Sequence, residues 1–376
     1  MSKAAELAAL IGSQTALSNR NLIINGAMQV AQRGTSTTGL KNTGGVFTID
    51  RFSYRRGGTW SNLQVKHEQV DVTDTLPASA GFKKALRATC TTAEGSVPAS
   101  NEATAIGYYM ERGETHRLGV GTSSMKTSTL SFYVKSSIAT TFGIAIVGNQ
   151  HSTNQKIKIP FTVSAANTYE RISVTIPAYN VALDSDADTT AGWTIHWVLD
   201  ATAATATNSV WSDSDDQGVL LPKDVSTTAF SNTLNATFEI TGVQLEAGEQ
   251  ATPFEHRSFG DELARCQRYY QVTGKATSNY HVFPAQRFSS TKVFFSVPIA
   301  TSMRGDPTLG STTTGNIGYV AGNGQSGNFA LSAVSFVNLD ASSITANITV
   351  GFTPNNTKGY TGYITTGDEL QFDAEL

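Results

Sequence analysis

Most of the chain alternates between apolar and polar residues with a period of two. In an extended strand this period turns one face toward a core and the other toward solvent, so such segments predict half-buried antiparallel strands. Segments rich in Ser, Thr, Asn, Gly and Asp separate them and predict turns. Many short strands at this spacing indicate a β-sandwich or a barrel, and no repeat of about 20 to 50 residues points to a solenoid. The clearest apolar positions are Leu130, Phe132 and Val134; Phe142, Ile144 and Ile146; Ile157, Ile159 and Phe161; and Ile172, Val174 and Ile176.

The alternation changes phase once, near residue 242. Phe238 and Ile240 occupy even positions, whereas Val243 and Leu245 occupy odd positions, and Gly242 lies between the two pairs. A β-bulge at the glycine would let both pairs face one core. We therefore expect a bulged strand here, which closes the sandwich.

Two segments carry a helical pattern instead. Apolar residues recur at helical spacing from Phe259 to Tyr270, with Ser258 available as a cap and acidic residues in the first turn. This predicts a connector helix over about residues 258–271. Near the N-terminus, Leu7 and Ile11 belong to a stripe shorter than the ~12–15 residues that hold a helix in water, so it needs a partner. The residues we expect in contacts of these two helices are Leu7, Ile11, Leu263, Cys266 and Tyr270.

Beyond the connector, strand-like alternation returns and predicts a second β domain of about 100 residues. Its strongest segments run over residues 293–299, 344–352 and 370–376. Arg304-Gly305-Asp306 spells a cell-adhesion tripeptide, but Pro307 follows it and favours a turn. We interpret the tripeptide as a turn.

Composition and charge exclude several classes of function. Only 15% of the 376 residues are charged, the net charge is −3, and no basic cluster is interleaved with aromatic residues, which argues against nucleic-acid binding. No segment approaches the ~20 apolar residues of a membrane span. Residues 1–20 lack the pattern of an export signal, so synthesis in a cytoplasm is expected.

Five segments, in this order, resemble a widespread family of bacteriophage virion proteins known as tail fibres or tail structural proteins. They are Asn21–Gly34, Ile49–Phe52, Thr129–Ser136, Thr241–Tyr270 and Phe372–Leu376. Together they extend over about residues 20–376. As an ordered set they are more specific than any one of them.

The resemblance implies an all-β virion protein. Residues 21–257 would form a jelly-roll sandwich similar to carbohydrate-binding modules, followed by the connector helix at 258–271 and a smaller β domain at 272–376. Residues 1–20 would anchor the chain to other virion proteins or pair with other copies. The implied function is host attachment by a homotrimeric fibre that binds cell-surface glycans as its receptor.

Exposed aromatic side chains are the natural candidates for carbohydrate binding, because an aromatic ring can stack on a sugar. Trp60 and Trp211 each lie among small and polar residues rather than in an apolar run. Tyr280, followed by His281 and Phe283, forms a further candidate patch. By contrast, Trp193 and Trp197 flank Ile195 at strand spacing and are interpreted as core, with His196 and Asp200 on the opposite face.

Metal and cofactor sites have little support. Asp184, Asp186 and Asp188 resemble the start of a calcium loop, yet Thr189 stands where that loop needs Gly and Ile195 where it needs Glu. An EF-hand is excluded, and an irregular calcium site stays open. Cys90 and Cys266 lack the spacing of a zinc or redox motif, and we expect no cofactor.

Nothing in the sequence points to catalysis. A glycosidase needs two carboxylates, one with a raised pKa. Glu170, Glu239, Glu246 and Asp200 are available, but the chain has 30 acidic residues, so some pair is inevitable. No nucleophile, zinc-helix or phosphate-loop motif occurs. We expect that the chain is not an enzyme. Two alternatives to an attachment protein stay open, a polysaccharide depolymerase and a purely architectural virion protein.

Overall fold

The computed structural model is all-β and divides into two units, one ending at Glu262 and the other running from Leu263 to Glu375. None of the helices among its described residues is long and apolar enough to cross a membrane. The structure describes residues 19–41, 44–96, 98–99, 102–148, 155–179, 191–204, 207–212, 221–225, 230–273, 281–287, 292–297, 299–309, 316–321, 326–330, 334–339, 344–349, 360–364 and 370–375.

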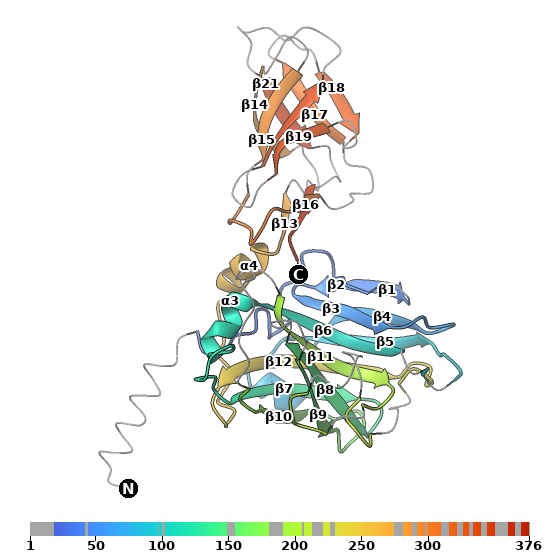
Figure 1. Ribbon diagram of the computed structural model, residues 1–376. Helices are drawn as coiled ribbons and strands as arrows, with labels where there is room; N and C mark the ends of the chain where they lie inside the picture. The colour runs from blue at the N-terminus through green and yellow to red at the C-terminus, as the bar shows by residue number, and fades with distance from the viewer. Residues whose placement is uncertain are drawn as a thin grey trace. The chain divides into compact units, whose positions relative to one another are not determined.

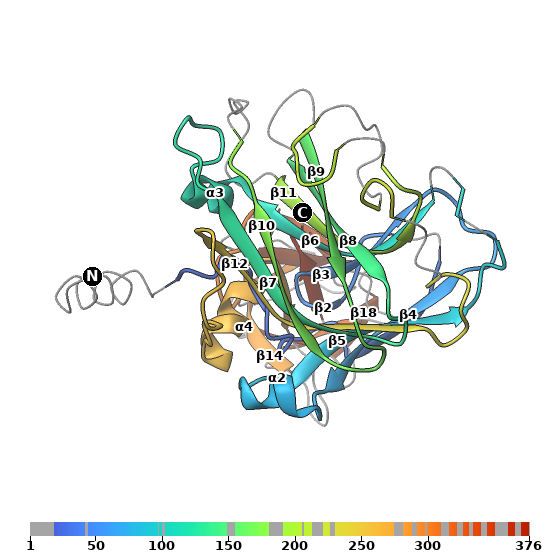
Figure 2. The same cartoon turned by 90° about the horizontal axis from the view of Figure 1, so that it is seen from below.

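Two six-stranded antiparallel sheets form the first unit, a jelly-roll sandwich (Figure 1). From β5 onward the chain crosses repeatedly between the sheets, and Figure 2 shows β7, β10 and β12 side by side in one of them. The first sheet has the order β1 (Ser36–Leu40), β4 (Gln64–Asp71), β5 (Lys84–Thr92), β12 (Thr237–Ala247), β7 (Ser128–Ser136) and β10 (Glu170–Ile176). The second has the order β2 (Val46–Ile49), β3 (Phe52–Gly57), β6 (Ala103–Glu111), β11 (Ala191–Ala201), β8 (Thr141–Gly148) and β9 (Gln155–Thr162).

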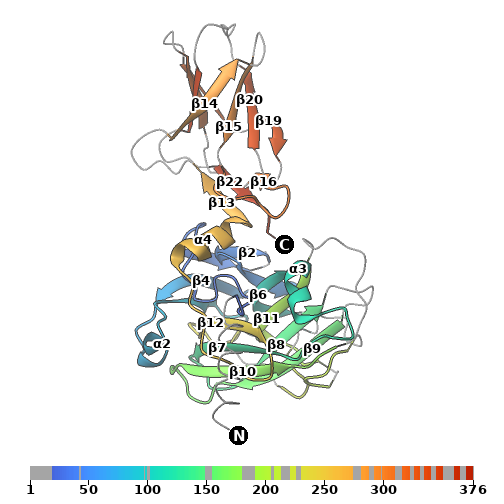
Figure 3. The ribbon, with the colours of Figure 1, turned by 90° about the vertical axis from the view of Figure 1, so that its left-hand side faces the viewer.

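Short helices lie outside the sheets of this unit. They are α2 (Thr75–Ser79), α3 (Arg112–Thr115) and the 3₁₀ turn η1 (His116–Leu118). The helix α3 packs against β6 and β11, as Figure 3 shows. Most of the core residues come from the strands, and η1 adds the buried Leu118.

The sandwich core confirms the expectation for the central tryptophans. Trp193 and Trp197 are buried on β11, and the Trp197 ring meets Phe132 of the other sheet edge-on at 5.8 Å. The opposite face of β11 is covered as well, because His196 and Asp200 are also buried. Leu221 joins the apolar cluster that covers this face.

The change of phase at Gly242 is a β-bulge, as expected. The pairing of β12 with β7 shifts register between Thr241 and Gln244, and Gly242 has a φ of +61°. Val243 and Leu245 are both fully buried beyond the bulge. As the last strand of the sandwich, β12 lies between β5 and β7, so an error in its phase would expose a central core strand.

The connector helix is shorter than predicted. Helix α4 spans Phe259–Gln267, and the Ser258 hydroxyl accepts a hydrogen bond from the Asp261 amide at 3.2 Å, which confirms the cap. Tyr270 does not continue the helix but begins β13 (Tyr270–Thr273), which pairs with β22 (Leu370–Asp373). The helical spacing of apolar residues continues to Tyr270 in the sequence, but the helix ends before it. Pairing of β13 with β22, about 100 residues later, overrides the local helical preference at Tyr270.

Two further antiparallel sheets make up the second unit. One has the order β13, β22 and β16 (Thr308–Leu309). The β14, β15, β19 and β20 strands of the other are visible in Figure 3. Its full order is β18 (Ser326–Ala330), β17 (Asn316–Ala321), β21 (Tyr360–Ile364), β14 (His281–Arg287), β15 (Lys292–Val297), β20 (Ile344–Thr349) and β19 (Val334–Leu339).

The Arg304-Gly305-Asp306 tripeptide is a bend with a structural arginine. The Arg304 guanidinium donates hydrogen bonds to the carbonyl oxygens of Ala374 and Glu375. The Arg304 amide donates to the Arg268 carbonyl at 2.8 Å. These bonds tie the bend to the end of β22, in agreement with its interpretation as a turn.

Candidate functional site

The segment 253–257, which follows β12 and precedes α4, uses its alternating side chains for two different purposes. Glu255 and Arg257 contact the N-terminal stretch of the sandwich. Phe254 and His256 join an aromatic cluster on the outer face of the first sheet. We call residues 253–257 the hinge segment. Its alternation separates a scaffold contact from a candidate binding surface.

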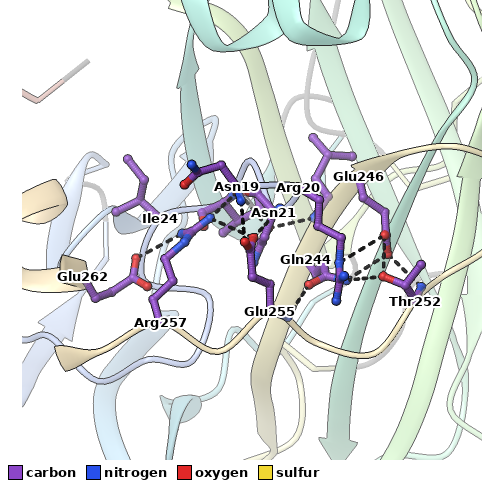
Figure 4. A network of polar contacts seen from close by, with 12 residues as sticks. Asn19, Arg20, Asn21, Ile24, Gln244, Glu246, Thr252, Glu255, Arg257 and Glu262 are labelled. Atoms are coloured by element: carbon purple, nitrogen blue, oxygen red, sulfur yellow. Dashed lines mark hydrogen bonds and ion pairs between the residues drawn. The ribbon is translucent and has the colours of Figure 1, made fainter. Parts of the chain in front are cut away.

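The scaffold side is a network of charged and amide groups (Figure 4). The Glu255 carboxylate accepts hydrogen bonds from the amides of Asn19 and Asn21 at 2.6 and 2.8 Å. Arg257 donates to the Ile23 carbonyl at 3.0 Å and lies 3.5 Å from the Glu262 carboxylate. Asn21 and Ile23 are buried, so these bonds satisfy polar backbone groups that water cannot reach.

The same network continues into the β12 strand. The Asn21 side chain bridges the strand, donating to the Val243 carbonyl and accepting from the Leu245 amide, each at 3.2 Å. Figure 4 also shows Gln244 beside Glu255, whose amide it accepts at 2.8 Å. Two of the segments that carry the family resemblance are therefore joined directly, although more than 220 residues separate them.

The Ile49–Phe52 motif has an equally structural role. The Asp50 carboxylate accepts the Gln32 amide at 2.9 Å, and the Asp50 carbonyl accepts the Asn25 side chain at 2.9 Å. Phe52 is fully buried. The residues of this motif thus help to hold the scaffold together.

On its other side the hinge segment builds an aromatic cluster. Phe82 lies at its centre, with ring centroids 4.8 Å from Phe254, 5.2 Å from His256 and 5.2 Å from Tyr133. The His256 Nε2 lies 2.8 Å from the Ala80 carbonyl, which it reaches as a donor. The segment after α2 and the hinge segment are therefore fastened to one another over the sheet.

A pocket of about 310 Å³ opens beside this cluster. Gly242 is part of its lining, and a Cβ atom on it would stand 2.6 Å from the Phe82 ring and 2.9 Å from the Tyr133 ring. The missing side chain thus lets these two rings pack directly against the bulged strand beside the pocket. The lining residues are Ala80, Ser131, Tyr133, Arg171, Gly242, Pro253, Phe254 and His256.

The electrostatic character of the pocket is cationic. Arg171 is exposed and donates one hydrogen bond, to the Thr252 carbonyl at 2.8 Å. None of the eight lining residues carries a carboxylate. Glu239, on the same strand as Gly242, is already bound by Arg87, Lys135 and Tyr169.

These contacts of Glu239 also affect the tyrosine. Burial, and then the neighbouring carboxylate, raise the pKa of Tyr169, so its hydroxyl stays protonated and donates to Glu239 at 2.7 Å. Glu239 is thus paired with Arg87 and Lys135 on the surface of the sheet. Arg171 lines the pocket.

Trp60 is not an exposed sugar platform, and that prediction is wrong. Its side chain is fully buried and its indole N–H donates to the Ala103 carbonyl at 3.1 Å. The polar residues around it misled the prediction because they bind a buried carboxylate: Glu94 accepts the amides of Ser61, Asn62 and Leu63 at 2.6–2.9 Å. Burial alone would raise the pKa of Glu94, but these amides lower it overall.

Trp211 is half-buried and packs against the core rather than standing free. Its ring lies between Tyr179 at 5.6 Å and Trp193 at 5.5 Å, and its indole N–H donates to the Pro177 carbonyl at 2.9 Å. The third predicted sugar-binding residue, Tyr280, lies outside the described residues. Among the described residues, no other predicted sugar-binding aromatic therefore lies beside Trp211.

The predicted oligomerisation residues divide into buried, half-buried and undescribed positions. Cys266 and Tyr270 are buried within the chain, which removes them from any contact between copies. Leu263 is half-buried and Phe259 at the start of α4 is 55% exposed. Leu7 and Ile11 lie outside the described residues.

The acidic candidates for catalysis or metal binding are not grouped into a site. Asp200 is buried and accepts the amide and hydroxyl of Ser231, and Glu246 accepts the hydroxyl of Thr252 at 2.6 Å. Glu170 accepts the Ser164 and Ala165 amides. No group of three or more potential metal ligands occurs among the described residues, and Asp184, Asp186 and Asp188 lie outside them.

Sequence analysis did not select Tyr133, Arg171, Phe254 or His256 as binding residues. Tyr133 and Arg171 are solvent-facing residues of ordinary strands, and strand alternation does not distinguish them from other polar-face residues. The alternation of aromatic and charged residues within 254–257 was the one available signal. It becomes informative only when the partners of each side chain are known.

No protein-family model matches the chain, and no curated protein does. Among solved structures, a candidate sugar-binding protein from Bacteroides thetaiotaomicron aligns with a TM-score of 0.33 at 12% identity, over 61% of this chain and 100% of its own. The enzymatically active domain of tailspike protein 4 of bacteriophage CBA120 aligns with a TM-score of 0.29 at 13% identity, over 61% of this chain and 22% of its own.

A family 11 carbohydrate-binding module of Clostridium thermocellum aligns with a TM-score of 0.28 at 11% identity, over 58% of this chain and 98% of its own. Scores and identities this low are not evidence of what this chain binds. The strand pairing of the chain itself shows the sandwich fold.

Proposed function

We propose that this chain is a bacteriophage virion protein, of the tail-fibre kind, whose sandwich attaches the particle to glycans on the host surface. The observation that carries the glycan-binding part is the pocket over Gly242. It combines half-buried aromatic rings, Tyr133 and Phe254, with hydrogen-bonding groups of Arg171, His256 and Ser131. Sugars have apolar faces and many hydroxyl groups, and such a mixed surface suits both.

The virion part of the proposal is supported by the five sequence segments that resemble phage virion proteins. Two of them, Asn21–Gly34 and Thr241–Tyr270, are joined by the hydrogen bonds of the scaffold beside the pocket. The protein would be located in the particle after synthesis in the bacterial cytoplasm. Other virion proteins would be contacted through residues 1–20.

A homotrimeric fibre would make weak individual sites effective. The pocket volume of about 310 Å³ is at the lower end of ligand sites, so we expect each site alone to bind weakly. Several copies on one particle raise the apparent affinity by about 10²–10⁴-fold when the spacing lets them bind together.

Binding by the purified chain to a panel of host-derived polysaccharides tests the proposal. Phe254→Ala, which removes an aromatic lining residue, should weaken binding by roughly 5- to 150-fold, given the ~1–3 kcal/mol that a stacked ring contributes. Phe259→Ala is the matched control, because this exposed phenylalanine lies five residues later and outside the pocket. Thermal melts of both variants establish that they are folded.

Normal binding by Phe254→Ala would move the site elsewhere on the chain. If the wild-type protein binds no host polysaccharide, attachment belongs to another protein and this chain is architectural. Incubation with the same polysaccharides also tests our expectation that the chain is not an enzyme. Newly formed reducing ends would identify it as a depolymerase.

A further inference from the structure

The lining of the pocket includes the guanidinium of Arg171 and no carboxylate, and this asymmetry indicates the chemistry of its ligand. Arg171 has five N–H donors, and its hydrogen bond to the Thr252 carbonyl uses one of them. Among the described residues it forms no ion pair. A guanidinium presents its donors as a planar fork that matches a carboxylate with two parallel hydrogen bonds.

The surrounding acids cannot satisfy this guanidinium, because each is already engaged. Glu239 is bound by Arg87 and Lys135, with N–O distances of 2.8 and 3.3 Å. Glu246 accepts hydrogen bonds from Thr252 and Gln244. These two carboxylates therefore already have partners, whereas Arg171 forms no ion pair in the part of the chain that the structure describes.

The remaining lining groups fit a sugar ring placed beside such a carboxylate. Phe254 and Tyr133 offer aromatic surface, and Gly242 adds no side chain to the lining. Ser131, which is buried at the base, contributes a hydroxyl that can bond a sugar hydroxyl. The volume of about 310 Å³ lies at the lower end of ligand sites and accommodates one or two sugar residues.

We propose that the pocket over Gly242 selects acidic glycans, with the carboxylate of a uronic acid bound by Arg171 and the ring of the same sugar packed against Phe254 and Tyr133. This inference rests on the proposed glycan-binding function and deepens it by naming the class of sugar. It assigns two separable roles: Arg171 confers preference for acid, and the aromatic walls confer affinity for sugar in general.

Calorimetric titration of the full chain with two probes of equal length, an oligogalacturonate and a neutral oligogalactoside, tests the inference. The wild-type protein should bind the oligogalacturonate more tightly, by roughly 10- to 100-fold, as expected for a charge-assisted hydrogen-bonded pair. Arg171→Gln should remove this preference and leave the weak binding of the neutral probe unchanged. Arg171→Lys should retain only part of the preference, since the ammonium keeps the charge but loses the fork.

Lys126→Gln is the control for net charge, because Lys126 is exposed and does not line the pocket. It should bind both probes as the wild-type protein does. Raising the NaCl concentration from about 50 mM to about 500 mM should weaken binding of the acidic probe alone, because the ion pair is partly screened.

Equal binding of both probes by the wild-type protein would overturn the acidic preference and leave glycan binding intact. An unchanged preference in Arg171→Gln would overturn the assignment to this residue. Failure to bind either probe would overturn the inference; retained binding to host polysaccharides, lost in Phe254→Ala, would show that the proposed function survives it.

Discussion

Gly242 shows how one residue serves the fold and the pocket together. Its φ of +61° allows the β-bulge that brings Val243 and Leu245 into the core. The same absence of a side chain lets the Phe82 and Tyr133 rings pack against the strand beside the pocket. A change at this residue is therefore expected to affect stability and the proposed ligand binding together.

We expect Gly242→Ala to lower the free energy of unfolding by roughly 1–3 kcal/mol, because the methyl group meets two packed rings and φ is unfavourable for alanine. Thermal or urea denaturation measures the change. Gly260→Ala is the matched control: it lies in α4 with no neighbouring atom within 4 Å of the added Cβ, and helix propensity should leave stability unchanged or raise it by up to about 1 kcal/mol. Equal effects of the two variants would contradict this account of Gly242.

At the scale of elements, β12 and the hinge segment connect the parts of the sandwich. β12 pairs with both β5 and β7, and its side chains meet the N-terminal stretch through Asn21. The hinge segment then returns over the outer face of the sheet, with Glu255 and Arg257 directed to the scaffold and Phe254 and His256 to the pocket. Five consecutive residues thus contribute both to the scaffold and to the lining of the pocket.

Leu245→Ala should cost about 2–5 kcal/mol, since the side chain is fully buried in the core of β12 and its removal leaves a cavity. The melting temperature measures the loss. Leu76→Ala supplies the comparison, because Leu76 is 46% exposed and its truncation should change stability little. An unchanged melt of Leu245→Ala would mean that the bulge does not place β12 as described.

Glu255→Ala should destabilise the sandwich by about 1–3 kcal/mol, because the Asn19 and Asn21 amides lose their acceptor and Asn21 is buried. Glu249→Ala, at an exposed position in the preceding turn, removes the same charge and should stay within about 0.5 kcal/mol of the wild type. Urea denaturation of both variants decides between a scaffold contact and a surface charge without structural effect.

At the scale of the molecule, acid should destabilise the sandwich through its buried histidines. Burial lowers the pKa of His67, and of His196, where the charge of Arg55 adds to the effect, from 6.5 to about 3. The unfolded chain therefore binds more protons than the folded one between these values. Stability is at its full value above pH 6.5 and falls as the pH decreases through this window.

Each histidine should contribute a slope of up to about 1.4 kcal/mol per pH unit between pH 6 and pH 5. Replacing one of them, in His67→Leu, should remove roughly half of the pH dependence in this range. His116→Gln, at an exposed position, should leave the slope as it is. A wild-type stability that is constant from pH 7 to pH 5 would contradict neutral burial of the two rings.

The proposed fibre should be a trimer in solution. Light scattering of the purified chain should give a mass three times the 40.0 kDa of one copy. Deleting residues 1–18 should lower this mass if these residues form the contact between copies. A monomer at high concentration would refute the trimer and remove the avidity argument, while the pocket itself would be unaffected.

The sequence by itself determined the strands and their phase, because burial of one face of a strand is a local periodic property. The alternation around Phe132, the phase change at Gly242 and the cap at Ser258 were all predictable, since each follows from residues a few positions apart. The strand at Tyr270 was not, because its partner is β22, about 100 residues later.

Only the tertiary structure decided which polar-face residues form a site. Trp60 lies in a polar segment yet is buried, and Glu94 binds the backbone amides of the residues that follow it. The pocket joins Tyr133, Arg171 and Phe254 from separate parts of the chain. Alternation assigns a residue to a face of its strand, but the register and order of the strands determine which residues become neighbours on that face, and those depend on pairings between distant segments.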